Sequence, residues 1–302
     1  MPVKTYNASI TELDLSYQEL RILPDLSRCT NLKKLNCSGN ELTHIDRLPK
    51  NLTYLKCCNN KLLRLDNLPG TLTNLDCSYN LLRHLGNLPD TITTLICGKN
   101  YLTHLDNLPS NLKFLGCSHN KLTHIDNLPN TLITLDCSHN KLSLVNNLPN
   151  NLITINCSYN ELAHLDNLPN TLINLICNYN DLTHLDNLPN TLINLTCNYN
   201  ELTILDNLPE TLEILYCNTN LLTSLDNLPS NLNILHCDYN ELTHLDNLPD
   251  TLTELDCSDN QLISLNNLPS ALIKLNCDRN PLQYDFLPTL ENILTYNSTK
   301  ST

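Results

Sequence analysis

Thirteen of the 15 cysteines recur every 20 residues from Cys37 to Cys277, and only Cys29 and Cys58 lie outside this series. A row of thiols could form disulfides, ligate a metal as thiolates, or pack as small apolar side chains. Side chains that line up in register point the same way, between leucines, which disfavours both disulfides and convergent metal ligation. We therefore expect reduced thiols in an apolar core, which suits the cytosol. Cys58 should point outward and is a candidate reactive thiol, although a tolerated surface cysteine is the simpler interpretation.

A second series places histidine two residues before aspartate. The histidines are His44, His84, His104, His124, His164, His184 and His244, and the matching positions hold Asp46, Gly86, Asp106, Asp126, Asp166, Asp186 and Asp246. The same column also includes Asp66, Asp206 and Asp226. Stacked carboxylates repel, and either protonated histidine or a bridging Ca²⁺ would relieve them, but no calcium-loop signature is present. Local turn hydrogen bonds by Asp and the following Asn are the favoured interpretation. No nucleophile recurs beside the column, which argues against catalysis there.

Asparagine forms the third series, from Asn40 to Asn280 at the same spacing. A row of amides could bind a ligand. An inward ladder that satisfies backbone groups at the turn after each strand is the stronger interpretation.

A 20-residue repeat positions all three series. The pattern LxxLxCxxNxLxxLxxLPxx occurs 13 times, beginning at Leu32 and ending with the copy that starts at residue 272. A degenerate copy, ITELDLSYQELRILPDL, precedes it. One repeat cannot bury its own leucines, whereas stacked repeats form a solenoid with one continuous core. The LxC segment alternates at period two and predicts a short strand, so the copies should pair as a parallel sheet.

This pattern resembles the leucine-rich-repeat family over about residues 10 to 290. The closest subtype is the short repeat of Gram-negative effectors and of proteins from large DNA viruses, marked by pairs such as Leu188-Pro189. The resemblance implies a horseshoe of the α/β class, mostly β and irregular, with a parallel sheet on the concave face. We expect little or no helix on the convex face, because 20 residues leave no room and the prolines fix an extended backbone. From this sequence we expect neither the N-terminal helical hairpin nor the ubiquitin-ligase domain of those effectors.

We expect one continuous domain in three parts. Residues 1–30 form an N-terminal cap that includes the degenerate first repeat, and residues 31–282 form the thirteen 20-residue repeats. Residues 283–302 form a C-terminal cap, in which PTLENILTY has weak helical character, followed by a disordered NSTKST tail.

The net charge of −13 argues against a nucleic-acid partner and against a polybasic membrane anchor. No segment has the apolar length of a signal peptide or a transmembrane helix. We expect a cytoplasmic protein, in the host cytoplasm if it is viral or an effector, with no cofactor and no resident metal.

Candidate binding residues follow from positions that vary among the repeats. Core positions hardly change, whereas the outward strand positions differ chemically. Drift on a free surface and selection for binding both produce such variety, but exposed apolar clusters favour a contact site. The candidate partner-binding residues are Ile96, Phe114, Ile176, Tyr199, Ile214, Tyr216, Ile234, His236 and Tyr239. Asp238, Glu254 and Asp256 should form an acidic border suited to a partner with basic residues.

The leading functional hypothesis is a non-catalytic scaffold that binds a protein partner on its concave face, as a viral or pathogen effector would. A structural or self-assembling repeat protein is the alternative. The sequence has no glycine-rich phosphate loop, HExxH or GxSxG motif, so an enzyme is not expected.

Overall fold

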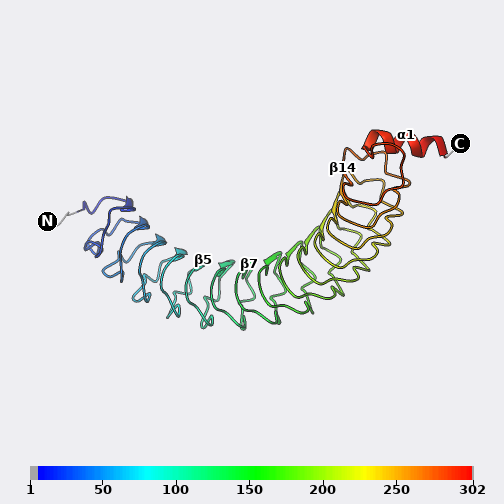
Figure 1. The fold of residues 1–302 in the computed structure, drawn as a ribbon. Coiled ribbons are helices and arrows are strands. Elements are labelled where there is room, and N and C mark those ends of the chain that lie inside the picture. The colour runs from blue at the N-terminus through cyan, green and yellow to red at the C-terminus, as the bar shows by residue number, and fades with distance from the viewer. Residues whose placement is uncertain (1–5, 301–302) are drawn as a thin grey trace. The chain divides into compact units, whose positions relative to one another are not determined.

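The computed structural model describes residues 6–300 (Figure 1). The pattern of contacts divides these residues into two units. Unit 1 contains residues up to 142 together with residues 146–152, and unit 2 contains residues 143–145 and those from 153 onward. Each unit is a stack of coils with one short strand per coil, which is the predicted leucine-rich-repeat solenoid.

Every strand in the described residues is three residues long. Unit 1 holds β1 (Glu12–Asp14), β2 (Lys34–Asn36), β3 (Tyr54–Lys56), β4 (Asn74–Asp76), β5 (Thr94–Ile96), β6 (Phe114–Gly116) and β7 (Thr134–Asp136). Unit 2 holds β8 (Thr154–Asn156), β9 (Asn174–Ile176), β10 (Asn194–Thr196), β11 (Ile214–Tyr216), β12 (Ile234–His236), β13 (Glu254–Asp256) and β14 (Lys274–Asn276). Within each unit, successive strands pair in parallel and in register, so that Leu35 lies beside Leu55 and Leu195 beside Leu215.

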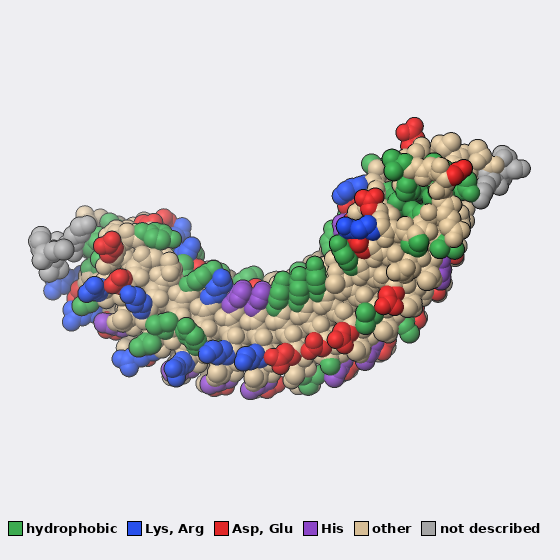
Figure 2. Space-filling model, in the orientation of Figure 1, with side chains coloured by type: hydrophobic (Ala, Val, Ile, Leu, Met, Phe, Trp, Pro, Cys, Tyr) green, Lys and Arg blue, Asp and Glu red, His purple; other side chains and the backbone are tan. Residues whose placement is uncertain are grey.

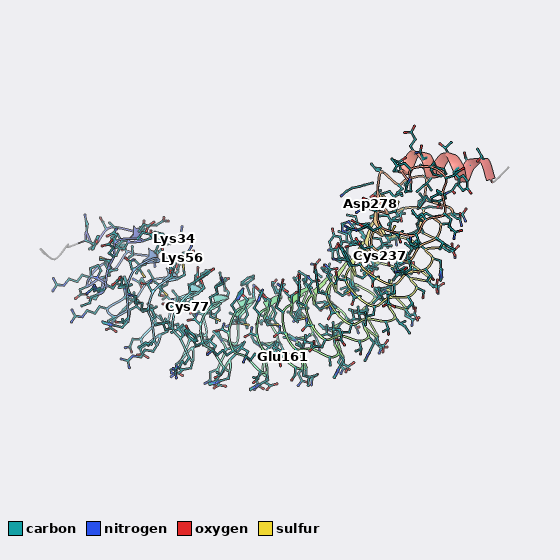
Figure 3. The ribbon with its side chains drawn as sticks, viewed as in Figure 1. Lys34, Lys56, Cys77, Glu161, Cys237 and Asp278 are labelled. Atoms are coloured by element: carbon teal, nitrogen blue, oxygen red, sulfur yellow. The ribbon has the colours of Figure 1, made fainter. Side chains whose placement is uncertain are left out.

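The core follows from the period of two within each strand. Leu55 and Cys57 point inward and are fully buried, whereas Lys56 between them is only half-buried on the outward face. Figure 3 shows Lys34 and Lys56 on the strand side of unit 1, with Cys77 among the coils. Leucines on the rest of each coil, such as Leu62 and Leu72, close the core because stacked copies bury one another.

The convex side of each coil is irregular, as the proline positions predict. Leu72 N donates to Pro69 O at 3.0 Å, and Thr91 Oγ1 donates to Leu72 O of the preceding coil at 2.7 Å. No helix in residues 6–300 has the length and apolar character needed to cross a membrane.

The helix α1 (Leu290–Lys300) lies at the C-terminal end of unit 2 (Figure 1). It packs onto the last coils: Ile293 is fully buried, and Asn297 Nδ2 donates to Leu265 O at 3.0 Å. The sequence predicts disorder for residues 297–302, but residues 297–300 belong to this helix. Residues 301–302, like residues 1–5 of the expected N-terminal cap, lie outside the described part of the chain.

Candidate functional site

The outward face of β11 and β12 brings four of the predicted residues together. The register places Ile214 beside Ile234 and Tyr216 beside His236. The rings of Tyr216 and His236 lie 4.7 Å apart at their centroids. All four side chains are half-buried by their neighbours on the face, which leaves part of each surface open. We name this group the outward cluster.

The acidic border of the outward cluster is already partly neutralised. Glu254 Oε1 lies 2.9 Å from His236 Nε2 and also accepts a hydrogen bond from Lys274 Nζ. These two contacts, with Lys274 the stronger, hold the pKa of Glu254 below its ordinary value. Burial, with the nearby Asp256 charge, instead raises the pKa of Asp238. Asp238 is therefore the carboxyl of this border that gains most from an incoming cation.

Unit 1 carries a second, smaller apolar group. A Cβ added to Gly116 would lie 3.4 Å from the Phe114 ring and 3.8 Å from Ile96 Cγ2, so both side chains close over this glycine. Gly116 is buried for that reason although it occupies an outward position. Ile96 and Phe114 are brought together as predicted.

Ile176 is separated from the outward cluster. Its direct neighbours along the sheet are Asn156 and Thr196, and Thr196 lies between it and Tyr216. The structure therefore assigns Ile176 to a polar stretch of the sheet.

Tyr199 and Tyr239 occupy the edge of the strand face, in a column that we call the rim column. Its members directly precede the column asparagines, and in unit 2 they are Tyr159, Tyr179, Tyr199, Thr219, Tyr239, Asp259 and Arg279. All seven have a positive φ between 51° and 56°, the left-handed region that non-glycine residues rarely adopt. Sequence reasoning missed this backbone strain. The sequence hints at this positive φ only through Gly39 and Asn59, which occupy the same column and are residue types that tolerate the left-handed region.

The charge difference between the units was also missed. Unit 1 contains 15 Lys and Arg against 12 Asp and Glu, a net charge of +3, whereas unit 2 contains 3 against 19, a net charge of −16. One column shows the change: Lys61, Lys121 and Lys141 in unit 1 are replaced by Glu161, Asp181 and Glu201 in unit 2. Figure 2 shows rows of basic and of acidic side chains on one flank. The charge difference could have been found from the sequence by counting charged residues separately in its two halves.

The asparagine and cysteine series have the structural roles predicted for them. Asn60 Nδ2 donates to Cys37 O at 3.0 Å and to Cys57 O at 3.1 Å, while its Oδ1 accepts from Leu42 N. The column thiols are buried, and burial raises the pKa of Cys157 to about 12. Cys58 is half-buried and donates to Ser38 Oγ at 3.2 Å.

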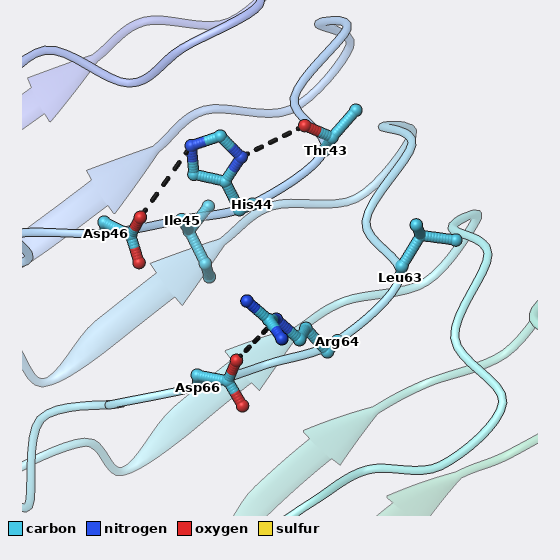
Figure 4. Close-up of a pocket in the computed structure, with 7 residues that line it drawn as sticks. All are labelled: Thr43, His44, Ile45, Asp46, Leu63, Arg64 and Asp66. Atoms are coloured by element: carbon cyan, nitrogen blue, oxygen red, sulfur yellow. Dashed lines mark hydrogen bonds and ion pairs between the residues drawn. The ribbon is translucent and has the colours of Figure 1, made fainter.

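The histidine and aspartate column lies on the exposed segments that follow each strand (Figure 4). His44 Nδ1 lies 3.1 Å from Thr43 Oγ1, and its Nε2 lies 3.7 Å from Asp46; Arg64 and Asp66 repeat the pairing in the next coil. The following asparagines, such as Asn67 and Asn187, have φ near 54°, which explains Asn at this turn. Among residues 6–300 no three His, Cys, Asp or Glu side chains converge as metal ligands.

Solved structures resemble this chain over most of its length. YopM from Yersinia pestis, described as a leucine-rich effector protein, is 30% identical with a TM-score of 0.79, covering 93% of this chain and 87% of that one. The chain belongs to the leucine-rich-repeat family. YopM from Yersinia enterocolitica WA-314 is 29% identical with a TM-score of 0.69, covering 90% and 75%.

A third solved structure also contains a row of cysteines. The functional domain of InlJ from Listeria monocytogenes is 28% identical, with a TM-score of 0.68 over 92% of this chain and 65% of that one. That domain includes a cysteine ladder. No family model and no curated protein matches the chain.

Proposed function

We propose that this protein is a non-catalytic scaffold that binds another protein through the outward face of its strands. The observation that carries the proposal is the outward cluster, where Ile214, Tyr216 and Ile234 lie side by side on a face that the core does not use. Contiguous apolar surface rimmed by polar groups is typical of protein contact sites, and tyrosine is a favoured anchor.

The acidic character of unit 2 defines the partner further. A net charge of −16 raises the local concentration of basic surfaces and speeds their association. The likeness to YopM, which is described as an effector protein, supports an effector role for this chain, and the proposed place of action is the host cytoplasm.

An affinity capture from eukaryotic lysate tests the proposal. Wild type is compared with Tyr216→Ser/Ile234→Asp, which removes the apolar surface of the outward cluster. The matched control is Asn74→Ser/Thr134→Asp, which introduces the same two residue types, Ser and Asp, at outward strand positions of unit 1. Circular dichroism verifies the fold of all three.

A captured protein is then purified, and its affinity for each variant is measured by calorimetry. We expect at least a tenfold weaker affinity for the cluster variant alone, since truncating a buried anchor costs about 2 kcal/mol or more. Equal affinities for the three proteins would remove the outward cluster from the proposal.

A further inference from the structure

The rim column of unit 2 contains a ladder of stacked tyrosines. The rings of Tyr159 and Tyr179 lie 4.2 Å apart at their centroids, and those of Tyr179 and Tyr199 lie 4.1 Å apart, nearly parallel in both cases. Hydrogen bonding to the neighbouring Tyr199 and Tyr159 hydroxyls, with some burial, raises the pKa of Tyr179 to about 12. The three rings therefore form a continuous stack on the edge of the strand face.

The stack is interrupted at Thr219, and Tyr239 occupies the position after it. Two steps of the size seen inside the stack would place the rings of Tyr199 and Tyr239 about 8 Å apart, which is the space that one planar group fills when it stacks on both rings. The exposed fractions agree with open ring faces: Tyr199 and Tyr239 are 44% and 51% exposed, whereas Tyr179 inside the stack is 38% exposed.

The base of this gap is fixed by the backbone. Thr219 N donates to Asp238 O at 2.9 Å, and Asn220 N donates to Tyr239 O at 3.2 Å. Thr219 itself has a φ of 54°, which is strained for a β-branched residue. Every rim residue of unit 2 has the same φ, so this backbone conformation belongs to the repeat and gives the side chain at position 219 the same starting direction as the tyrosines on either side.

Tyr239 already stacks with a planar group of this chain, which indicates what kind of group could stack on it from the gap. The Arg279 guanidinium lies over the Tyr239 ring, 5.7 Å from its centroid. Its Nη2 donates to the Tyr239 hydroxyl at 3.1 Å and to the Asp259 carboxylate. A guanidinium is planar and cationic, so it stacks on an aromatic ring and pairs with a carboxylate at once.

Charge favours the same group in the gap. Asp238 directly precedes Tyr239, is half-buried, and takes part in none of the ion pairs found among residues 6–300. Lys274 and Arg279, the two cations of unit 2 outside α1, are already paired with Glu254 and Asp259. A neutral aromatic ring would fill the same space, but unlike a guanidinium it would gain no electrostatic attraction from Asp238.

We propose that the gap between Tyr199 and Tyr239 is an arginine-binding subsite, in which the guanidinium of a basic segment on a partner protein completes the ladder. The inference rests on the proposed function and specifies its partner chemistry. The bound arginine would be sandwiched by two rings and would bring its charge next to Asp238.

A nuclear magnetic resonance titration of the full chain, labelled at the tyrosine rings, tests this assignment. The probes are acetyl-Gly-Arg-Gly-amide, its lysine counterpart and its tryptophan counterpart. We expect the arginine peptide to shift the Tyr199 and Tyr239 signals and to bind at least fivefold more tightly than the lysine peptide, because a compact ammonium cannot stack. Preference for lysine, preference for tryptophan, or unshifted rings would each overturn the assignment.

The variant Thr219→Tyr adds the missing ring and should reduce arginine binding at least tenfold. Thr219→Ser leaves the gap open and should retain it. Should Thr219→Tyr fail to fold, Tyr239→Leu removes one wall and should reduce binding by the same amount. Unchanged binding in the folded filling or wall variant contradicts the subsite.

The two proposals fail separately. Loss of partner affinity in Tyr216→Ser/Ile234→Asp, with no arginine response at the rim, removes only the subsite. An arginine response with no effect of the cluster variant removes only the outward cluster.

Discussion

The interior ladders and the rim column repeat with the same period but differ in how fully their groups are satisfied. Each column asparagine bonds to backbone groups of its own and neighbouring coils, as Asn180 does with Cys157 O, Cys177 O and Leu162 N. The rim residues one position earlier are partly exposed and have a strained backbone, and the column holds several residue types, from three successive tyrosines to Thr219 and Arg279. The asparagine positions therefore stabilise the solenoid, whereas the rim positions are available to bind a partner.

The largest effect expected from this contrast is unfolding at alkaline pH. Burial raises the pKa of Cys157 and Cys197 to about 12 and that of Cys177 well above its ordinary value of 9.0. Between pH 9 and 11 the unfolded chain loses thiol protons that the folded chain keeps, so stability falls as pH rises. In this range each such thiol lowers the free energy of unfolding by about 1.4 kcal/mol per pH unit, so these three alone lower it by about 4 kcal/mol per pH unit.

Urea denaturation at pH 8, 9, 10 and 11, followed by circular dichroism under reducing conditions, measures this loss. The triple variant Cys157→Ala/Cys177→Ala/Cys197→Ala should show a shallower dependence on pH, whatever its stability at pH 8. A denaturation midpoint that stays constant to pH 11 would contradict the role of the buried thiols.

Breaking the asparagine ladder should give the next largest effect. Asn180→Ala leaves Leu162 N without its acceptor and two carbonyls without their donor, all of them buried. We expect a loss of about 3 kcal/mol, since each unsatisfied buried group costs roughly 1–3 kcal/mol. The exposed Asn170→Ala is the matched control and should change stability by about 0.5 kcal/mol or less. Similar urea denaturation midpoints for the two variants would contradict the stabilising role of the asparagine ladder.

The interior was predictable from the sequence because it is determined by period and side-chain type. Cys37 and Asn40 recur without exception, Leu35 recurs with Ile155 as its one replacement, and their register, burial and ladder bonds follow from stacking alone. The helix boundary at Lys300 was missed because Asn297, Ser298 and Thr299 have low helical propensity. Packing of Ile293 and Asn297 against the last coils holds the helix instead.

The candidate site was predictable only in part. The neighbours Ile214 and Ile234 follow from the register of identical repeats. The positive φ of Thr219, the stacking of Tyr179 on Tyr199 and the pairing of Glu254 with Lys274 depend on three-dimensional detail that no spacing rule contains.

Relieving the strain in the rim column should have a smaller effect with the opposite sign. Thr219→Asn replaces a β-branched residue by a type that tolerates the left-handed region, at a cost difference of about 1 kcal/mol. We expect the urea midpoint to rise accordingly. The control Thr196→Asn makes the same replacement in β10, where the backbone is extended, and should not stabilise. A stability loss in Thr219→Asn would show that Thr219 is not strained.

The smallest effect concerns the ion pair beside the outward cluster. Lys274→Ala removes the stronger of the two contacts that lower the pKa of Glu254, so that pKa should rise toward its ordinary value of 4.5. A lowered carboxyl pKa contributes stability above pH 4.5 that is lost as pH falls, and an exposed pair contributes little of it. Carbon-detected titration of the Glu254 carboxyl measures the shift, with Lys141→Ala in unit 1 as the control. An unchanged Glu254 titration in Lys274→Ala would contradict the role of Lys274 and would assign the lowered pKa of Glu254 to its contact with His236.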